Sequence, residues 1–320
     1  MALLAGVAAN LTWPILSYSA ETVAAAPASG CGTSRIGEIT IATVQNAPIV
    51  TLFANRSPVT VLLDTGAEWT IFTPAVAKRI GAQTPRIEFK RQLRGLEGTL
   101  ATTEVELHSF TAGDVAIPWL RVRVAALDMP SVFSGPLDGV LGADTLSSFD
   151  IDLELARHRM AFYTKQTCPN AAPAWPLPYT AIITGRSPSN HLFFPVLLDG
   201  RRIDAFFDTG AQFTVLSTKA ALALGVTEAA LARDRATVTL GAAAERLNSH
   251  LHRFSKLEVG DEVVHNPEIN VADVKLRDAD LVLGIDFLSS RRVWLSYGSR
   301  QIFLSERLRS ALAKPSTRSR

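Results

Sequence analysis

The four-residue sequence Asp-Thr-Gly-Ala occurs twice in this chain, and its two copies carry the side chains best suited to chemistry. The first copy begins at Asp64 and the second at Asp208. Two carboxyl groups held close together cannot both ionise cheaply, so they share one proton near their working pH. The ionised partner can then accept a proton from a bound water while the protonated partner polarises a carbonyl group. The pair predicts general acid–base catalysis without a covalent intermediate.

Each copy follows an apolar run that predicts a buried strand, namely Val59–Leu63 before the first and Ile203–Phe207 before the second. Gly66 and Gly210 permit the tight turn that presents each aspartate. A single copy would be interpreted as an ordinary turn at the end of a strand, where Asp and Gly are common. Two copies in the same context favour a functional pair.

The repeat extends to a second motif downstream of each turn, at Leu137–Leu146 and again at Asp280–Leu288. The two aspartates are 208 − 64 = 144 residues apart, and the motif glycines, Gly142 and Gly284, are 284 − 142 = 142 residues apart. An offset that drifts by only two residues indicates duplicated domains. These Leu-Gly segments are assigned a structural role and no part in catalysis.

Alternating apolar and polar residues predict mainly strands around these motifs. Hairpins are expected at Phe149–Tyr163 and Val293–Leu304, and short helices at Pro74–Ile80 and Thr218–Leu224, each ended by a glycine. A further short helix is expected after each Leu-Gly motif. The opening strands are expected at Glu38–Val44 and Ile49–Phe53.

The arrangement resembles the aspartic peptidase superfamily, and within it the retropepsin-like bacterial proteins, over Ile36–Thr164 and Tyr179–Arg307. The resemblance implies an all-β fold with short helices, in which two acid-protease-like β-barrel lobes face each other across a cleft. It implies an aspartic endopeptidase whose Asp64 and Asp208 activate a water. Thr65 and Thr209 resemble the interlocking threonines that bridge the two turns in this family.

The family also covers its cleft with a mobile hairpin between the two motifs of a lobe. Gly95 and Gly98, in Arg94–Gly98, are candidates for the first such flap. Gly241, in Thr239–Ala243, is the candidate for the second. An ordinary surface hairpin is the alternative in both lobes. No tyrosine lies in either segment, so the expected flaps resemble those of retropepsins rather than those of pepsin-like enzymes.

Changes in composition along the chain predict its domain boundaries. A Pro-rich stretch cannot propagate regular structure and predicts a linker between the lobes. The expected organisation is an export segment at 1–30, a first lobe at 31–167, the linker at 168–178, a second lobe at 179–308 and a basic tail at 309–320.

The N-terminal segment Met1–Ala20 contains no charge and is followed by small residues, which predicts export to the periplasm or the cell exterior. A disordered N-terminus and a retained anchor are the alternatives. The two cysteines, Cys31 and Cys168, bracket the first repeat, and an exported protein could join them as a disulfide. A lipid anchor at Cys31 and two free thiols remain open alternatives.

The remaining composition narrows the choice of partners. A formal net charge of +2 gives no support to a nucleic-acid partner, and phosphate-binding and dinucleotide-binding motifs are absent. The closest pair of histidines, His250 and His252, has no third ligand in the sequence, so neither a metal nor a cofactor is expected. The expected partner is a polypeptide substrate, and the expected state is a monomer with its dyad within one chain. Pairing of lobes between chains, and a non-catalytic peptide-binding module, are the rival interpretations.

Overall fold

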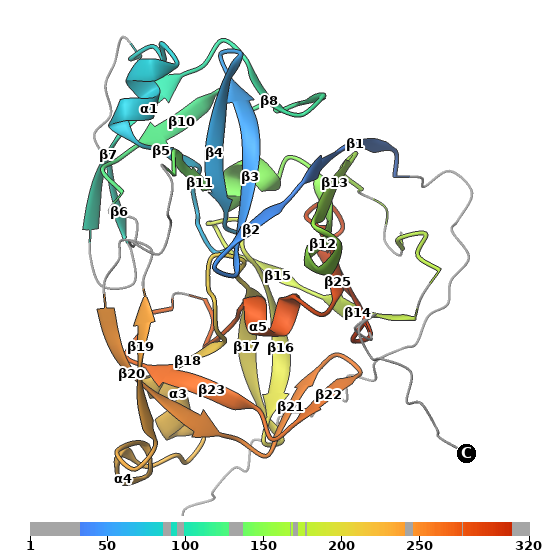
Figure 1. The fold of residues 1–320 in the computed structure, drawn as a ribbon. Helices are drawn as coiled ribbons and strands as arrows, with labels where there is room; N and C mark the ends of the chain where they lie inside the picture. The colour runs from blue at the N-terminus through green and yellow to red at the C-terminus, as the bar shows by residue number, and fades with distance from the viewer. Residues whose placement is uncertain are drawn as a thin grey trace, which may run out of the picture.

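The computed structural model describes residues 33–85, 91–94, 99–127, 137–166, 168, 172–176, 178–240, 246–276 and 278–308. These residues form two β-rich lobes, one above the other in Figure 1, and a sheet to which both lobes contribute. The described helices are all short. They are α1 (Pro74–Arg79), α2 (Ala143–Leu146), the 3₁₀ turn η1 (Leu155–Arg157), α3 (Thr218–Ala223), α4 (Glu228–Leu231) and α5 (Ile285–Leu288).

The first lobe is built on a sheet with the strand order β6-β7-β10-β5-β11-β4-β3-β8-β9, and β2 pairs with β3 beside it. Alternate residues of β3 and β4 point into its apolar core, as the period of two requires. The strands are β2 (Ala42–Val44), β3 (Ala47–Ala54), β4 (Ser57–Leu63), β5 (Ile71–Phe72), β6 (Arg91–Arg94), β7 (Thr99–Glu106), β8 (Phe110–Ala112), β9 (Val115–Ala116), β10 (Arg121–Val124) and β11 (Gly139–Leu141).

The second lobe repeats this topology strand for strand, in the order β19-β20-β23-β18-β24-β17-β16-β21-β22, with β15 beside β16. The duplicated sequence therefore folds twice into the same arrangement. The strands are β15 (Gly185–Arg186), β16 (Leu192–Leu198), β17 (Arg201–Phe207), β18 (Val215–Ser217), β19 (Arg235–Leu240), β20 (Arg246–Arg253), β21 (Lys256–Val259), β22 (Glu262–His265), β23 (Glu268–Ala272) and β24 (Leu281–Leu283).

The helices predicted from the sequence are confirmed to within a residue at their ends. The Thr73 hydroxyl accepts a hydrogen bond from the Val76 amide at the start of α1, and Gly81 follows its end with φ of 64°. In α3 the Ser217 hydroxyl accepts a hydrogen bond from the Ala220 amide, and Gly225 follows the end of the helix with φ of 97°. The short helices after the Leu-Gly motifs are α2 and α5. Helix α4 was not expected from the sequence.

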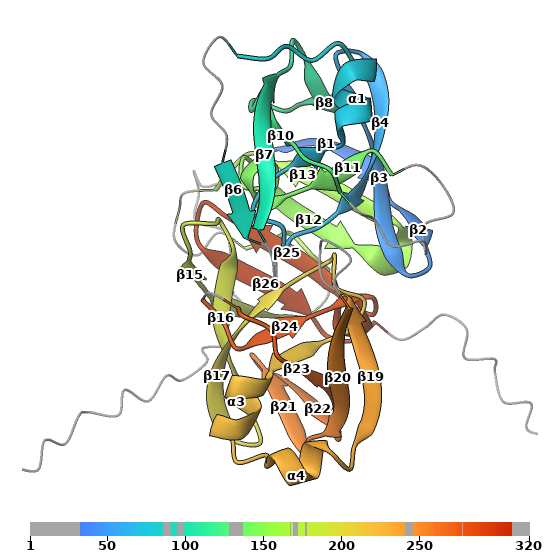
Figure 2. The same ribbon diagram turned by 90° about the vertical axis from the view of Figure 1, so that its left-hand side faces the viewer.

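The third sheet joins the lobes, with the strand order β1-β13-β12-β25-β26-β14 (Figures 1 and 2). The hairpins predicted from the sequence form, but they do not stay within separate lobes, because β12 of the first half pairs antiparallel with β25 of the second half. This shared sheet is the main link between the two halves. Its strands are β1 (Arg35–Thr40), β12 (Asp150–Glu154), β13 (Arg159–Tyr163), β14 (Tyr179–Ile183), β25 (Arg292–Ser296) and β26 (Gln301–Ser305).

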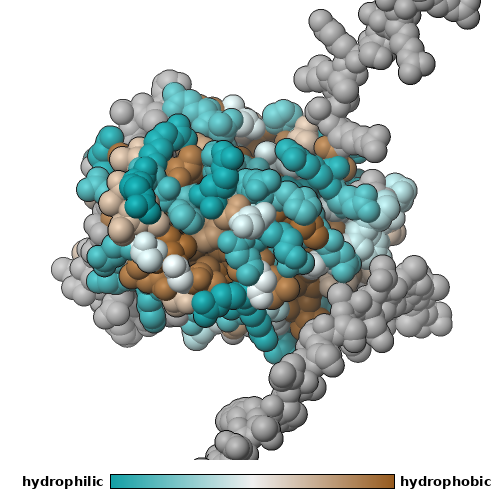
Figure 3. Space-filling model, turned by 90° about the horizontal axis from the view of Figure 1, so that it is seen from below, coloured by the Kyte–Doolittle hydropathy of each residue, from teal (hydrophilic) through white to brown (hydrophobic). Residues whose placement is uncertain are grey.

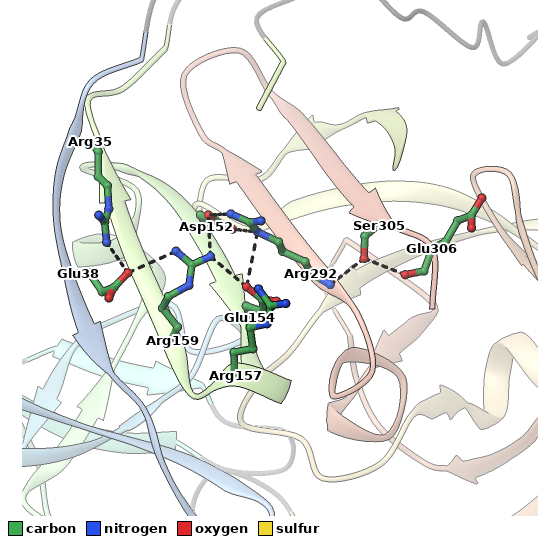
Figure 4. A network of polar contacts seen from close by, with 9 residues as sticks. All are labelled: Arg35, Glu38, Asp152, Glu154, Arg157, Arg159, Arg292, Ser305 and Glu306. Carbon is green, nitrogen blue, oxygen red and sulfur yellow. Dashed lines mark hydrogen bonds and ion pairs between the residues drawn. The ribbon is translucent and has the colours of Figure 1, made fainter. Parts of the chain in front are cut away.

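One face of the shared sheet is apolar and continues the cores of both lobes. The opposite face of β12 is acidic, and its carboxylates at Asp150, Asp152 and Glu154 are all buried. Figure 4 shows Arg159 and Arg292 reaching Asp152 and Glu154 from the strands on either side, whereas Asp150 accepts a hydrogen bond from the Ser296 hydroxyl at 2.8 Å. Arg292 donates to both oxygens of Asp152, with distances of 2.8 Å from Nε and 2.6 Å from Nη2. A bidentate pair of this kind compensates the cost of burying both charges.

The segment that follows β13 contains Cys168, which is disulfide-bonded. Cys31, the other cysteine of the sequence, lies outside the described residues, so its pairing with Cys168 stays a prediction. We expect non-reducing peptide mapping to recover one Cys31–Cys168 peptide, and reduction to lower the free energy of unfolding by about 2–5 kcal/mol. Two free thiols in the isolated protein, or a lipid on Cys31, would contradict this pairing.

The surface of the second lobe is mixed in polarity (Figure 3), where hydrophilic and hydrophobic residues alternate across the face seen from below. For example, the exposed side chains of Leu197 and Val263 are separated by Glu258 on the strand between them. Among the described residues, no helix is long and apolar enough to cross a membrane. The proposed export segment at 1–30 and the basic tail at 309–320 lie outside the described residues.

Candidate active site

The two acidic turns lie at the ends of equivalent strands in the two lobes. Asp64 follows β4, and its amide donates to the Leu141 carbonyl of the neighbouring parallel strand β11 at 3.1 Å. Asp208 follows β17, and its amide donates to the Leu283 carbonyl of β24 at 3.0 Å. The second motif of each repeat thus supports the turn of the first motif. This explains why both motifs recur at nearly constant spacing.

The structure brings the side chains of Asp64 and Asp208 together, although 144 residues separate them. Each carboxyl group lies directly against the glycine of the opposite turn. A Cβ atom at Gly210 would be 2.5 Å from Cγ of Asp64, and a Cβ atom at Gly66 would collide with the carboxyl of Asp208. Glycine is therefore required at both positions, because the carboxyl group of the opposite turn leaves no room for a side chain.

Within each turn, one carboxylate oxygen is held by the backbone. Oδ1 of Asp64 accepts hydrogen bonds from the amides of Gly66 at 2.9 Å and Ala67 at 2.8 Å. Oδ1 of Asp208 accepts from the amides of Gly210 at 2.7 Å and Ala211 at 3.2 Å. These bonds fix both side chains and leave the second oxygen of each for other partners.

Thr65 and Thr209 interlock across the boundary between the lobes. The hydroxyl of Thr65 donates to the Phe207 carbonyl at 2.8 Å and accepts from the Thr209 amide at 3.1 Å. The hydroxyl of Thr209 donates to the Leu63 carbonyl at 2.6 Å and accepts from the Thr65 amide at 3.0 Å. Both threonines are buried, so these four bonds are shielded from water. They hold the two turns in one fixed relation.

Burial raises the pKa of Asp64 well above its ordinary value, and the adjacent Asp208 carboxyl raises it further by charge and by a side-chain hydrogen bond. The backbone amides of Ala67 and Gly66 oppose this shift. Two carboxyl groups in contact titrate as a pair, so the raised pKa describes a proton that the pair retains. A group of this kind is suited to general acid–base catalysis near mildly acidic pH.

A second layer of polar contacts lies under each turn and was not singled out in the sequence. Asp144 accepts from the amide and the hydroxyl of Thr70, both at 2.8 Å. Asp286 accepts from the amide of Thr214 at 3.0 Å and from its hydroxyl at 2.8 Å. The signal was present, because Thr70 and Thr214 each lie six residues after a turn aspartate in the repeat. These pairs lock the loop after each turn onto the Leu-Gly segment.

The Leu-Gly segments lie against the loops after the turns, which is consistent with the structural role assigned to them from the sequence. A Cβ atom at Gly142 would be 2.5 Å from the Trp69 carbonyl oxygen, and one at Gly284 would be 2.7 Å from the Phe213 carbonyl oxygen. The amides that follow donate to the turns, from Ala143 to the Ala67 carbonyl at 2.8 Å in the first lobe. The glycines are thus needed for close packing of two backbone segments.

A family model described as "Aspartyl protease" matches this sequence twice, at residues 49–145 and 194–287, which together exceed half of the chain. The chain belongs to the aspartyl protease family. The two matched regions coincide with the two lobes and contain the two acidic turns.

Among solved structures, this aspartyl protease is similar in fold to the aspartic proteinase from Irpex lacteus, with a TM-score of 0.51 and 15% sequence identity. The similarity covers 86% of this chain and 98% of that one, so it extends over both lobes and the shared sheet region. A comparison with curated proteins found no match.

The strands that flank the two candidate flaps, β6 with β7 and β19 with β20, lie on the same side of the molecule (Figure 1). The last paired residues before the turn are Arg94 of β6 with Thr99 of β7 in the first lobe. In the second lobe they are Leu240 of β19 with Arg246 of β20. The glycines proposed for the flap turns, Gly95, Gly98 and Gly241, lie outside the described residues. Their role as flaps stays a prediction.

The surroundings of the dyad differ between the lobes. In the first lobe the guanidinium of the buried Arg123 lies 3.8 Å above the ring of Trp69 and holds that side chain in place. At the equivalent position of the second lobe, Phe213 is 56% exposed.

The histidine pair considered in the sequence lies elsewhere in the second lobe. There His252 contacts Asp234 at 2.6 Å, and the described residues contain no cluster suited to a metal ion.

Replacing Thr65 with Val is expected to lower both stability and cleavage, because the Phe207 carbonyl and the Thr209 amide would lose their buried partner. An unsatisfied buried polar group costs about 1–3 kcal/mol, which urea unfolding can measure. Thr65→Ser keeps the hydroxyl and serves as the matched control, with a much smaller loss. Equal losses in the two variants would show that the hydrogen bonds of the hydroxyl do not account for the effect.

Proposed function

We propose that this protein is an aspartic endopeptidase in which Asp64 and Asp208 activate a water molecule within a single chain. The observation that carries the proposal is the contact between the two carboxyl groups, each lying on the glycine of the opposite turn. The family assignment supports a protease-like function. The interlocked threonines support an intramolecular site, because both turns belong to one chain and are bonded to each other.

The chemistry follows from one proton shared by two carboxyl groups. The ionised carboxylate accepts a proton from water, and the water oxygen bonds to the carbonyl carbon of the peptide. The protonated carboxyl donates its proton to the carbonyl oxygen, which gives a neutral tetrahedral diol. When the carbon–nitrogen bond breaks, the nitrogen takes up the proton of the protonated aspartate, and one diol hydroxyl gives its proton to the ionised aspartate as the carbonyl re-forms. The products are a carboxylic acid and an amine, and the pair again holds one proton.

The substrate in this proposal is a polypeptide, and the proposed location is outside the cytoplasm. The export segment and the bracketing cysteines motivate that location. The decisive experiment incubates the isolated protein with a diverse peptide library and reads the products by mass spectrometry. We expect internal cleavage that a statine-type inhibitor blocks. Tight inhibitor or peptide binding without any cleavage would instead identify a peptide-binding module.

The pH dependence follows from the alanines that flank the dyad. Ala67 and Ala211 offer the carboxylates only backbone amides. A serine hydroxyl at either position would donate a further hydrogen bond and favour the ionised form, which lowers the pH at which the dyad loses its first proton. The wild-type optimum is expected to be mildly acidic, on the order of pH 4–6. In Ala67→Ser with Ala211→Ser, the acid limb of the rate–pH profile should move to lower pH. A limb that stays in place or moves upward would contradict this account.

A further inference from the structure

His191 lies beside the dyad and has no counterpart in the first repeat. It directly precedes β16 and stacks on Phe206, with ring centroids 5.2 Å apart and planes 4° from parallel. The hydroxyl of Ser189 is 3.2 Å from its Nδ1. The equivalent residue in the first lobe, at position 191 − 144 = 47, is Ala47. The histidine is therefore an addition to one lobe and is not required by the fold.

The ring lines a cavity together with a residue of the acidic turn of the opposite lobe. Together with Thr65 and Phe207, His191 lines a cavity of about 10 Å³ between the interlocked threonines and the shared sheet. Its Nε2 is buried and has no hydrogen-bond partner within the described part of the chain. The Gly66 backbone raises the pKa of the His191 ring. Gly66 in turn packs on the Asp208 carboxyl. His191 and the dyad thus share a common neighbour.

Three carboxylates of the described residues act on the charge of the His191 ring. They are Asp208 at the end of β17, Glu68 in the turn of the first lobe, and Asp278 in the loop before β24. Burial lowers the pKa of His191, whereas these carboxylates and the Gly66 backbone oppose the shift. The neutral imidazole is thus favoured at neutral pH, and the ring becomes cationic only as the pH falls. Coupling between two such sites is reciprocal, so a cationic ring favours an ionised dyad.

We propose that His191 is a positioning residue of the active site and a third ionisable group coupled to the dyad. It stacks on Phe206 beside Thr65, and in its cationic form it keeps the dyad singly ionised to lower pH than two aspartates alone would allow. This inference rests on the proposed peptidase function for its kinetic consequence. The coupling between His191 and Asp208 itself does not depend on catalysis.

The coupling is tested by NMR titration of the histidine ring signals in the full-length protein. The His191 signal is assigned by its absence in His191→Gln. In Asp208→Asn the midpoint of His191 should move to lower pH, because the ring loses a facing carboxylate. Asp199→Asn is the control, since Asp199 lies at the far end of β16 and its positive φ of 49° suits asparagine equally well. An unchanged midpoint in Asp208→Asn, or equal shifts in both variants, would overturn the proposal.

The kinetic consequence is tested by the pH dependence of kcat/KM on a cleaved peptide. In His191→Gln the acid limb should move to higher pH, because the ring can no longer carry a charge. His265→Gln changes an exposed histidine on β22 and should leave the limb in place. A lower rate with an unmoved limb would mean that His191 only packs, and would also overturn the proposal. Absence of cleavage in the wild type would reject the proposed function, and the NMR titration would still decide the coupling.

Discussion

Peptide cleavage is expected to fall by about 10⁴-fold in both Asp64→Asn and Asp208→Asn, the upper end of what general acid–base catalysis contributes. An amide cannot accept the proton of water or hold the shared proton, so either change removes the dyad. The fold should persist, because Oδ1 of an asparagine can still accept from the backbone amides that now bond to each aspartate. Steady-state kinetics and urea unfolding measure the two effects separately.

Mixing the two variants tests whether the site belongs to one chain. The interlocked threonines join turns of the same chain, so an equimolar mixture of Asp64→Asn and Asp208→Asn should remain inactive. Recovery of activity on mixing would show that lobes of different chains pair and complete each other's dyads. Asp199→Asn, an equivalent change on the surface, should retain full activity and provides the control for the substitution itself.

Arg292→Ala is expected to cost about 3–5 kcal/mol of unfolding free energy, the range found when one partner of a buried ion pair is removed. Arg292 lies on β25 of the second half, and it is the bidentate partner of Asp152 on β12 of the first half. Without it, the fully buried Asp152 carboxylate keeps only a 3.4 Å contact with Arg159. Urea unfolding of the variant measures the loss.

Arg253→Ala is the matched control for this loss. Arg253 pairs with Glu268 at 2.7 Å, but both side chains are largely exposed. Pairs of this kind contribute about 0–1 kcal/mol because water screens them. A similar small effect in Arg292→Ala would mean that the charged face of the shared sheet contributes little to joining the two halves.

The repeat made most of the candidate site visible in the sequence. Asp64, Thr65 and Gly66 recur as Asp208, Thr209 and Gly210, and the constant spacing identified both copies as equivalent. The same argument would have found Thr70 with Asp144 and Thr214 with Asp286, which were overlooked because they do not bear on acid–base chemistry. His191 could not be found in this way. A lone histidine without a counterpart in the repeat gives no sequence signal, and its importance depends on which turn folds against it.

The shared sheet was the part of the fold least open to prediction. The alternation in β12 correctly predicts a strand, but it does not identify the neighbour. Polar residues at Asp150, Asp152 and Glu154 ordinarily indicate a face in water. Here the face is buried, because arginines on neighbouring strands pair with Asp152 and Glu154, and the bidentate arginine comes from the other half of the chain. Asp150 is instead satisfied by hydrogen bonds from the Ser296 hydroxyl and the Gln166 amide. Strand pairing over such a distance depends on the cores of both lobes, which periodicity does not describe.

The position of β12 in the shared sheet also sets the order of events during synthesis. Its Asp152 finds Arg292 only after 140 further residues have been added, and a ribosome adds residues at about 5–20 per second. Until then the first lobe has an unpaired strand edge with acidic side chains in water. While the 144 residues from Asp64 to Asp208 are being added, the nascent chain holds only one aspartate of the proposed dyad. The shared sheet and the second aspartate are completed only when the second half of the chain has been made. The first half alone therefore cannot form the proposed dyad.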